Sequence, residues 1–385
     1  MIKPLDLLTP VPDRLRNLCE HKSVNLAGNC IEYITTGFNE EDLRQYNIAL
    51  LGIAYQDAEQ HLNTVREDFY SLYLHSDHLK IIDLGNVLME RNDQSDYDRI
   101  EQIIGELLKY NVFVIPFGKS PVYLNYCYNA LKLVDNSVTI TYISNSATLG
   151  NAGDNLSRQN YLAHLLNDID DKLFSLNILS YQLYQTDPDS LVLLNKLYCQ
   201  ATRLGSLRLD FKLVEPLLRD SDLLGINISA IRHSDAPASL HCTPNGLYAE
   251  EVCQLARYAG ISDRLTIGGI FGFKLEKDNN RTTSQLVAQV MWHLIDGYMA
   301  RKNDSPLKNV NGIKKYIVDM GAPMQQLVFH YSTLSERWWM EVPGETSSNN
   351  LLIACSNDDY RSACNHEVPL RWVWFHQKLS QKKQL

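Results

Sequence analysis

The chain has 385 residues, of which 45% are hydrophobic and 21% are charged, and its formal net charge is −9. This is a globular composition, and the chain is long enough to bury a large core. Nucleic-acid binding would need clustered Lys and Arg, which the acidic balance disfavours. The chain also has no apolar run near the ~20 residues of a membrane helix. We therefore expect neither nucleic acid nor a membrane as partner.

Eight cysteines are scattered along the chain without a Cys-x-x-Cys pair. Scattered thiols of this kind are typical of a reducing compartment. The first residues, MIKPLDLLTPVPDRLRN, are too interrupted by proline and charge to form a signal peptide. These two features predict a cytoplasmic protein.

Strand and helix patterns alternate through the first part of the chain. Short continuous apolar runs predict buried parallel strands, and apolar residues at i, i+4 and i+7 predict helices. The predicted strands are 48–54, 79–87, 112–116 and 138–143, and the predicted helices are 62–74, 96–110 and 123–133.

The alternation continues in the second half, with strands at 176–179, 223–228 and 265–273, helices at 248–259 and 283–299, and further short strands at 317–319 and 327–331. Such alternation favours a parallel sheet with crossover helices. We see no repeat or flexible linker. We therefore expect one α/β domain over 47–305, an N-terminal extension over 1–46, and a C-terminal extension over 306–385 packed on the same domain.

Four segments stand at the carboxyl ends of predicted strands, and three of them carry polar side chains. In open α/β sheets, ligands gather at the carboxyl ends of the strands. The segments at these ends are 117–120 (FGKS), 144–148 (SNSAT), 227–230 (NISA) and 270–273 (IFGF). A binding site is expected where these segments meet.

In their order and context, these segments resemble the ureohydrolase superfamily, which contains arginase, agmatinase and formimidoylglutamase. IALLGIA and IIDLGNV resemble the opening strands of that family. VFVIPFGKS stands where the family has Gly-Gly-x-His, ITYISNSAT where it has Asp-Ala-His-x-Asp, and LLGINISAIRHSDAP where it has Ser-Phe-Asp-x-Asp. GGIFGFKLEKDNNRTTSQLVAQ resembles the Glu-x-Asn-Pro-x-x-Asp segment and the following helix. The resemblance covers residues 47–300 and implies a three-layer α/β/α sandwich with a mainly parallel, arginase-like sheet.

The resemblance also implies a cofactor, a pair of Mn²⁺ ions held by His and Asp, which bridge a hydroxide that attacks an amidine carbon. The corresponding positions here carry neutral residues, and the slot of the family's catalytic Glu carries Gly272. Neutral hydroxyls and an amide cannot offset the dehydration of two divalent ions. The former ligand slots are Ser120, Ser144, Ser146, Thr148, Asn227 and Ser229.

The sequence therefore predicts a non-catalytic homologue without a metal cofactor. It would act as a binding or scaffold protein, through a relic pocket for a small polar ligand or through an unknown protein partner. The alternative is a metal-dependent amidine hydrolase of the formimidoylglutamase or agmatinase type. That alternative requires four or more carboxylates and imidazoles to converge.

Three polar residues near these segments are further candidates for the pocket. Lys119 could meet an anion, replace part of the lost metal charge, or be solvated. His233 and Asp235, with His241 and Cys242 nearby, could form a mononuclear metal site or an acid–base pair. A solvated polar loop is the more frequent arrangement for such a segment.

Four of the five tryptophans lie near the C-terminus. Tryptophan and arginine are favoured at the centres of interfaces, which makes this region a candidate for binding a partner. The alternative is that they pack the C-terminal extension onto the domain, because exposed tryptophan is costly. The family resemblance separately implies a homo-oligomer. The tryptophans are Trp338, Trp339, Trp372 and Trp374.

Overall fold

The computed structural model describes residues 4–35, 38–55, 58–75, 78–89, 94–167, 172–307, 311–321, 325–344 and 350–382. No helix in these ranges is long and apolar enough to cross a membrane.

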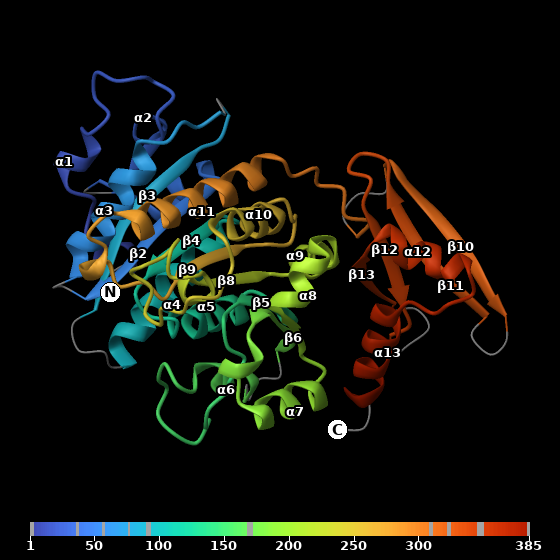
Figure 1. The fold of residues 1–385 in the computed structure, drawn as a ribbon. Helices are drawn as coiled ribbons and strands as arrows, with labels where there is room; N and C mark the ends of the chain where they lie inside the picture. The colour runs from blue at the N-terminus through green and yellow to red at the C-terminus, as the bar shows by residue number, and fades with distance from the viewer. Residues whose placement is uncertain are drawn as a thin grey trace.

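The centre of the molecule is a nine-stranded parallel sheet (Figure 1). Its strand order is β1-β3-β2-β4-β9-β8-β5-β6-β7, so the chain crosses over repeatedly. Six of these strands are buried along almost their whole length, as expected for a sheet covered on both faces. The strands are β1 Ile31–Tyr33, β2 Ile48–Tyr55, β3 Ile81–Met89, β4 Phe113–Gly118, β5 Val138–Ile143, β6 Leu173–Tyr181, β7 Gln200–Arg203, β8 Leu223–Asn227 and β9 Ile267–Phe271.

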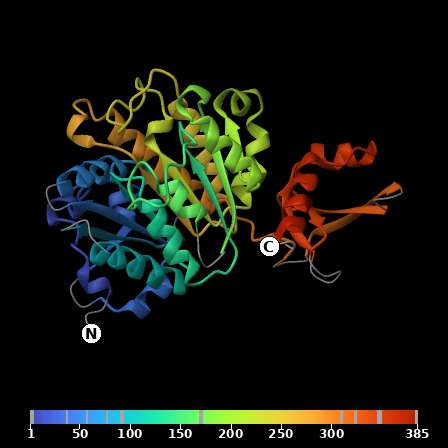
Figure 2. The same ribbon diagram turned by 90° about the horizontal axis from the view of Figure 1, so that it is seen from below.

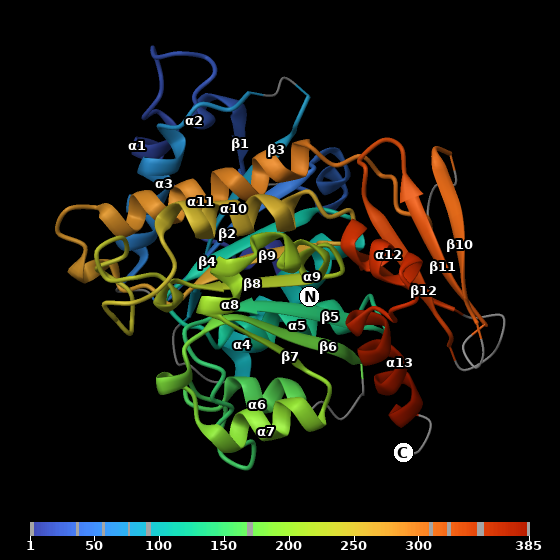
Figure 3. The same cartoon turned by 45° about the vertical axis from the view of Figure 1, so that its right-hand side comes forward.

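Helices cover both faces of this sheet and make the expected three layers (Figure 3). One apolar core lies between the sheet and the layer that contains α3, α10 and α11. A second lies between the sheet and the layer of α4, α5, α6 and α7. The helices are α1 Asp13–Arg16, α2 Ala27–Cys30, α3 Glu59–Tyr70, α4 Gln94–Lys109, α5 Tyr123–Lys132, α6 Tyr161–Leu166, α7 Pro188–Lys196, α8 Leu204–Leu209, α9 Glu215–Arg219, α10 Ala249–Gly260 and α11 Thr282–Met299.

The two chain extensions differ in how they join the domain. Within residues 1–46, β1 pairs with β3, so the N-terminal extension adds an edge strand to the sheet. The C-terminal extension instead forms a four-stranded antiparallel sheet with two helices, which we call the C-terminal module. Its elements are β10 Ile313–Gly321, β11 Gln325–Ser332, β12 Trp338–Val342, β13 Leu351–Cys355, α12 Asn357–Cys364 and α13 Leu370–Lys382.

The C-terminal module has an apolar core of its own, which includes Phe329, Met340, Ile353 and Phe375. It stands beside the α/β domain (Figure 2). The sequence predicts a C-terminal extension packed on the same domain; the module has its own core, and it also contacts the domain, where Phe375 stacks on Phe174 of β6 with ring centres 6.0 Å apart. A separate core is possible because alternate residues of four short strands present one apolar face, and α12 and α13 cover that face.

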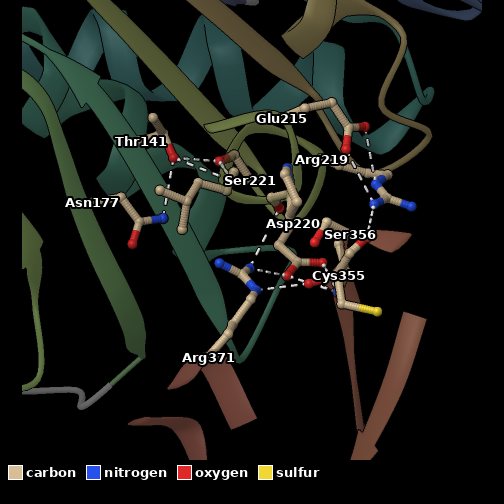
Figure 4. Close-up of polar contacts among 12 residues, drawn as sticks. Thr141, Asn177, Glu215, Arg219, Asp220, Ser221, Cys355, Ser356 and Arg371 are labelled. Carbon is tan, nitrogen blue, oxygen red and sulfur yellow. Dashed lines mark hydrogen bonds and ion pairs between the residues drawn. The ribbon is translucent and has the colours of Figure 1, made fainter. Parts of the chain in front are cut away.

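A polar junction fastens the module to the segment between α9 and β8 (Figure 4). The Asp220 carboxylate accepts the Ala354 amide at 3.0 Å and Arg371 Nη2 at 2.8 Å. Arg219 Nη2 donates to the Cys355 carbonyl at 2.8 Å, and its guanidinium lies 4.7 Å from the ring centre of Trp339. Because this segment precedes β8, the junction lies at the amino end of that strand. The former ligand slots lie at the opposite, carboxyl ends of the strands.

Candidate functional site

The loop after β5 carries three of the former ligand slots, and their hydroxyls bind the protein's own backbone. The Ser146 hydroxyl donates to the Gln185 carbonyl at 2.8 Å. Ser144 Oγ accepts the Ser146 amide at 3.2 Å, and Thr148 Oγ1 accepts the Asp187 amide at 2.9 Å. These bonds fasten the loop after β5 to the segment after β6.

The slots after β8 belong to a buried hydrogen-bond network. Asn227 Nδ2 donates to the Tyr142 hydroxyl at 2.9 Å, and that hydroxyl lies 2.8 Å from the hydroxyl of Tyr161. Asn227 Oδ1 accepts the Ser229 amide at 3.0 Å, while Ser229 Oγ accepts the His241 amide at 3.3 Å. Burial raises the pKa of Tyr161 to about 12 and the pKa of Tyr142 well above its usual value, so both phenols stay neutral.

Gly272, the residue that the resemblance sets in the slot of the family's Glu, leaves no room for a side chain. The residue has φ +87°, a conformation that favours glycine. A Cβ at this position would lie 2.1 Å from Asn227 Oδ1. The Asn227 side chain therefore occupies the space that a residue 272 side chain would need.

The donor set of these slots does not fit a pair of manganese ions. Ser120, like Ser144, Asn227 and Ser229, is buried, and its Oγ lies 3.4 Å from the Val122 amide. None of the six slots offers a carboxylate or an imidazole, which are the ligands hard divalent ions need. Across the part of the chain that the structure describes, no three His, Cys, Asp or Glu residues are grouped to hold a metal.

Asp235 has a structural role in the fold. Its carboxylate accepts hydrogen bonds from Arg232 Nε at 2.8 Å and from the Ser234 hydroxyl at 2.9 Å. It also accepts one at 3.0 Å from the backbone amide of Ala249, the first residue of α10. Burial alone would raise the pKa of Asp235, but these hydrogen bonds outweigh it and lower the pKa. His233 is exposed, and its backbone amide bonds to Thr243. The carboxylate is thus committed to holding the start of α10.

A small pocket opens beside Lys119, between the ends of β2 and β4 and the segment after β9. Lys119 Nζ lies 3.2 Å from Glu276 Oε1 at its rim. Burial opposes ionisation of Glu276, but a backbone hydrogen bond and Lys119 together lower its pKa. His61 also lines the pocket, and its Nδ1 is buried without a hydrogen-bond partner. Glu276 and His61 were missed by the sequence reasoning, although Glu276 lies only four residues after Gly272.

The four C-terminal tryptophans belong to the C-terminal module. Trp339 and Trp372 are buried and so are core residues, unavailable to a partner. Trp338 is half-buried and stacks on Tyr360 with ring centres 4.5 Å apart. Trp374, also half-buried, meets the ring of Tyr198 in the α/β domain. All four side chains thus make packing contacts, and a partner-binding role for the half-buried Trp338 and Trp374 stays a prediction.

No protein-family model matches the sequence, and no curated protein matches it. Solved structures do match. Formiminoglutamase from Trypanosoma cruzi, determined with Mn²⁺, has a TM-score of 0.60 at 13% identity and aligns over 69% of this chain and 97% of that chain. Formimidoylglutamase from Bacillus subtilis has a TM-score of 0.62 at 14% identity, over 71% of this chain and 92% of that chain.

The chain has the arginase-superfamily fold. Proclavaminate amidino hydrolase from Streptomyces clavuligerus also matches, with a TM-score of 0.56 at 14% identity, over 67% of this chain and 93% of that chain. The predicted fold class is confirmed by these matches and by the nine-stranded parallel sheet. Almost the whole of each solved enzyme is covered, whereas about a third of this chain lies outside the arginase-fold alignment.

Proposed function

We propose that this chain is a non-catalytic relative of the manganese-dependent amidine hydrolases and acts by binding rather than by hydrolysis. The observation that carries the proposal is the set of side chains at the carboxyl ends of the strands. The six slots hold neutral side chains, and the hydroxyl and amide groups there bond to the protein itself.

The charge balance supports the same proposal. A Mn²⁺ pair brings four positive charges into a small volume and must be dehydrated to enter. Carboxylates offset this cost in a hydrolase, whereas Ser, Thr and Asn bring no charge. Binding a metal here would also break hydrogen bonds that hold the loops after β5 and β8.

The pocket beside Lys119 is the proposed place for a small polar ligand. It combines the Lys119–Glu276 ion pair and His61 with an apolar wall that includes Ile53, Leu62 and Phe273. A few polar groups beside an apolar lining suit a small ligand with a polar end. The scattered cysteines support a reducing, cytoplasmic location for this activity.

The test is metal content together with amidine hydrolysis. The purified chain is incubated with excess Mn²⁺, desalted and analysed for manganese, with the Bacillus subtilis formimidoylglutamase treated in parallel as positive control. We expect less than about 0.1 equivalent in this chain, because hard ligands are missing. We also expect no hydrolysis of formiminoglutamate, agmatine or arginine. A manganese content of about two ions per chain, together with hydrolysis of any of these amidines, would overturn the proposal.

A further inference from the structure

Strand β10 forms one edge of the sheet in the C-terminal module. It spans nine residues and, among the residues that the structure describes, pairs with β11 alone. It lies on the far side of the module from the α/β domain (Figure 1). A strand in this position presents a row of backbone N–H and C=O groups to any further strand.

The side chains of β10 alternate between two faces. Tyr316, Val318 and Met320 are partly buried against the core of the module. Lys315, Ile317 and Asp319 are exposed on the opposite face, and 57% of Ile317 is accessible. The exposed face thus carries a cation, a large aliphatic group and an anion, spaced two residues apart. Lys315 Nζ also lies 3.5 Å from Glu341 Oε1 of β12, but 53% of the Lys315 side chain remains accessible.

We propose that β10 pairs antiparallel with β10 of a second copy of this chain, about a two-fold axis that passes through Ile317. In that register the two Ile317 side chains meet, and each Lys315 faces Asp319 of the second copy. The charges complement each other twice, as a two-fold interface requires. The two four-stranded sheets join into one continuous sheet.

Alternative registers are less favourable. With the axis through residue 315, the two Lys315 side chains face each other, and with the axis through residue 319 the two Asp319 side chains do. Both registers place like charges in contact. Axes through residues 316 or 318 bring one of the charged residues opposite Ile317. Lysine on an edge strand ordinarily opposes pairing, and here it selects the one register in which it meets a carboxylate.

The aliphatic contact between β10 and β11 supports the same axis. Ile317 pairs with Val328 on β11. The row continues on the same exposed face through Glu341 of β12, which pairs with Lys315 and His330, to Leu352 of β13. Pairing at Ile317 would bring this row against the same row of the second copy. The exposed aliphatic surface of Ile317 would then be buried, which favours association.

A charge exchange tests the register. We expect sedimentation velocity to show a dimer of the full chain. Lys315→Asp and Asp319→Lys each place like charges in contact and should weaken dimerisation roughly tenfold or more. The double variant K315D/D319K restores opposite charges and should restore the dimer. Lys314→Asp is the control, because residue 314 lies on the other face, and it should leave the dimer intact.

A disulfide trap locates the axis independently. The exposed Cys242 and Cys364 are first replaced by Ser. In that background, Ile317→Cys should form a covalent dimer under copper–phenanthroline oxidation, and Lys314→Cys should not. Thermal unfolding of each variant verifies that it is folded. A monomeric wild-type chain, or a dimer that neither charge reversal weakens, would overturn the proposal.

This interface is remote from the strand ends of the α/β domain. Its test therefore stands or fails independently of the proposed loss of hydrolysis.

Discussion

At the scale of single residues, the sequence identifies which side chains stand at the strand ends but not what they bind. The neutral character of Ser144, Ser146 and Asn227 can be recognised from the resemblance alone. Their hydrogen bonds to Gln185 and Tyr142 cannot, because those partners come from other parts of the chain. The local sequence around a serine or asparagine does not identify a hydrogen-bond partner that lies far away in the chain.

Gly272 is the position where a small substitution should have a large effect. Gly272→Ala adds a Cβ 2.1 Å from Asn227 Oδ1 and places alanine at φ +87°. We expect a loss of about 1–3 kcal/mol in the free energy of unfolding, measured by urea denaturation. Gly205→Ala is the matched control, because its Cβ would meet nothing within 4 Å and alanine favours the helix α8. Equal stability of the two variants would contradict the close contact at Gly272.

Asp235 should contribute stability that depends on pH. Because its pKa is lowered in the folded chain, its contribution is present above the unfolded value of about 3.9 and is lost as the pH falls through the folded pKa. The stability difference between wild type and Asp235→Asn should therefore shrink below about pH 4. Unfolding curves between neutral and acidic pH measure it. A difference that stays constant down to the acid limit would show that the carboxylate charge does not hold α10.

At the scale of elements, the long buried strands and amphipathic helices could be predicted closely. The predicted strand 138–143 coincides with β5, and the predicted helix 123–133 ends one residue beyond α5. By contrast, β1 and β12 were missed. The three residues of β1 are a strand because β3 lies beside them, and no local apolar pattern marks them. The Trp338–Trp339–Met340 run of β12 has three consecutive large apolar side chains, two of which are buried. The run therefore lacks the alternation of apolar and polar residues that predicts a half-buried strand.

The junction between α9 and the C-terminal module depends on Asp220. This buried carboxylate accepts the Ala354 amide and faces Arg371. Asp220→Asn keeps the shape but removes the charge, so Arg371 loses its ionic partner. We expect a loss of about 1–3 kcal/mol, with faster hydrogen exchange in β13. Asp358→Asn is the control, since Asp358 pairs with Arg361 on an exposed surface, and there we expect little change. Unchanged hydrogen exchange in β13 of the Asp220→Asn variant would show that Asp220 does not hold the module to the domain.

At the scale of the whole molecule, the chain consists of two bodies with separate apolar cores. The arginase-fold domain contains the two cores on either side of its sheet, and the C-terminal module contains the third. The segment between α11 and β10, residues 300–312 (ARKNDSPLKNVNG), is polar and contains Pro and Gly, so its composition marks the boundary that the sequence reasoning placed at residue 305 without recognising a linker. Four consecutive strands within residues 313–355 pair with one another in chain order and with no strand of the nine-stranded sheet, and this pairing separates the module.

The distribution of tryptophan makes this separation measurable. Four of the five tryptophans lie in the C-terminal module, and the fifth, Trp292, lies in α11. In the variant Trp292→Phe, tryptophan fluorescence reports the module alone, whereas far-ultraviolet circular dichroism reports mainly the larger domain. The module has the smaller core, and polar contacts at Asp220 and two aromatic contacts, Phe174–Phe375 and Tyr198–Trp374, join it to the domain. We therefore expect its fluorescence transition at lower urea than the dichroism transition. Asp220→Asn in the same background should widen the gap, because it weakens the junction. Coincident transitions in both variants would mean that the two bodies unfold as one cooperative unit.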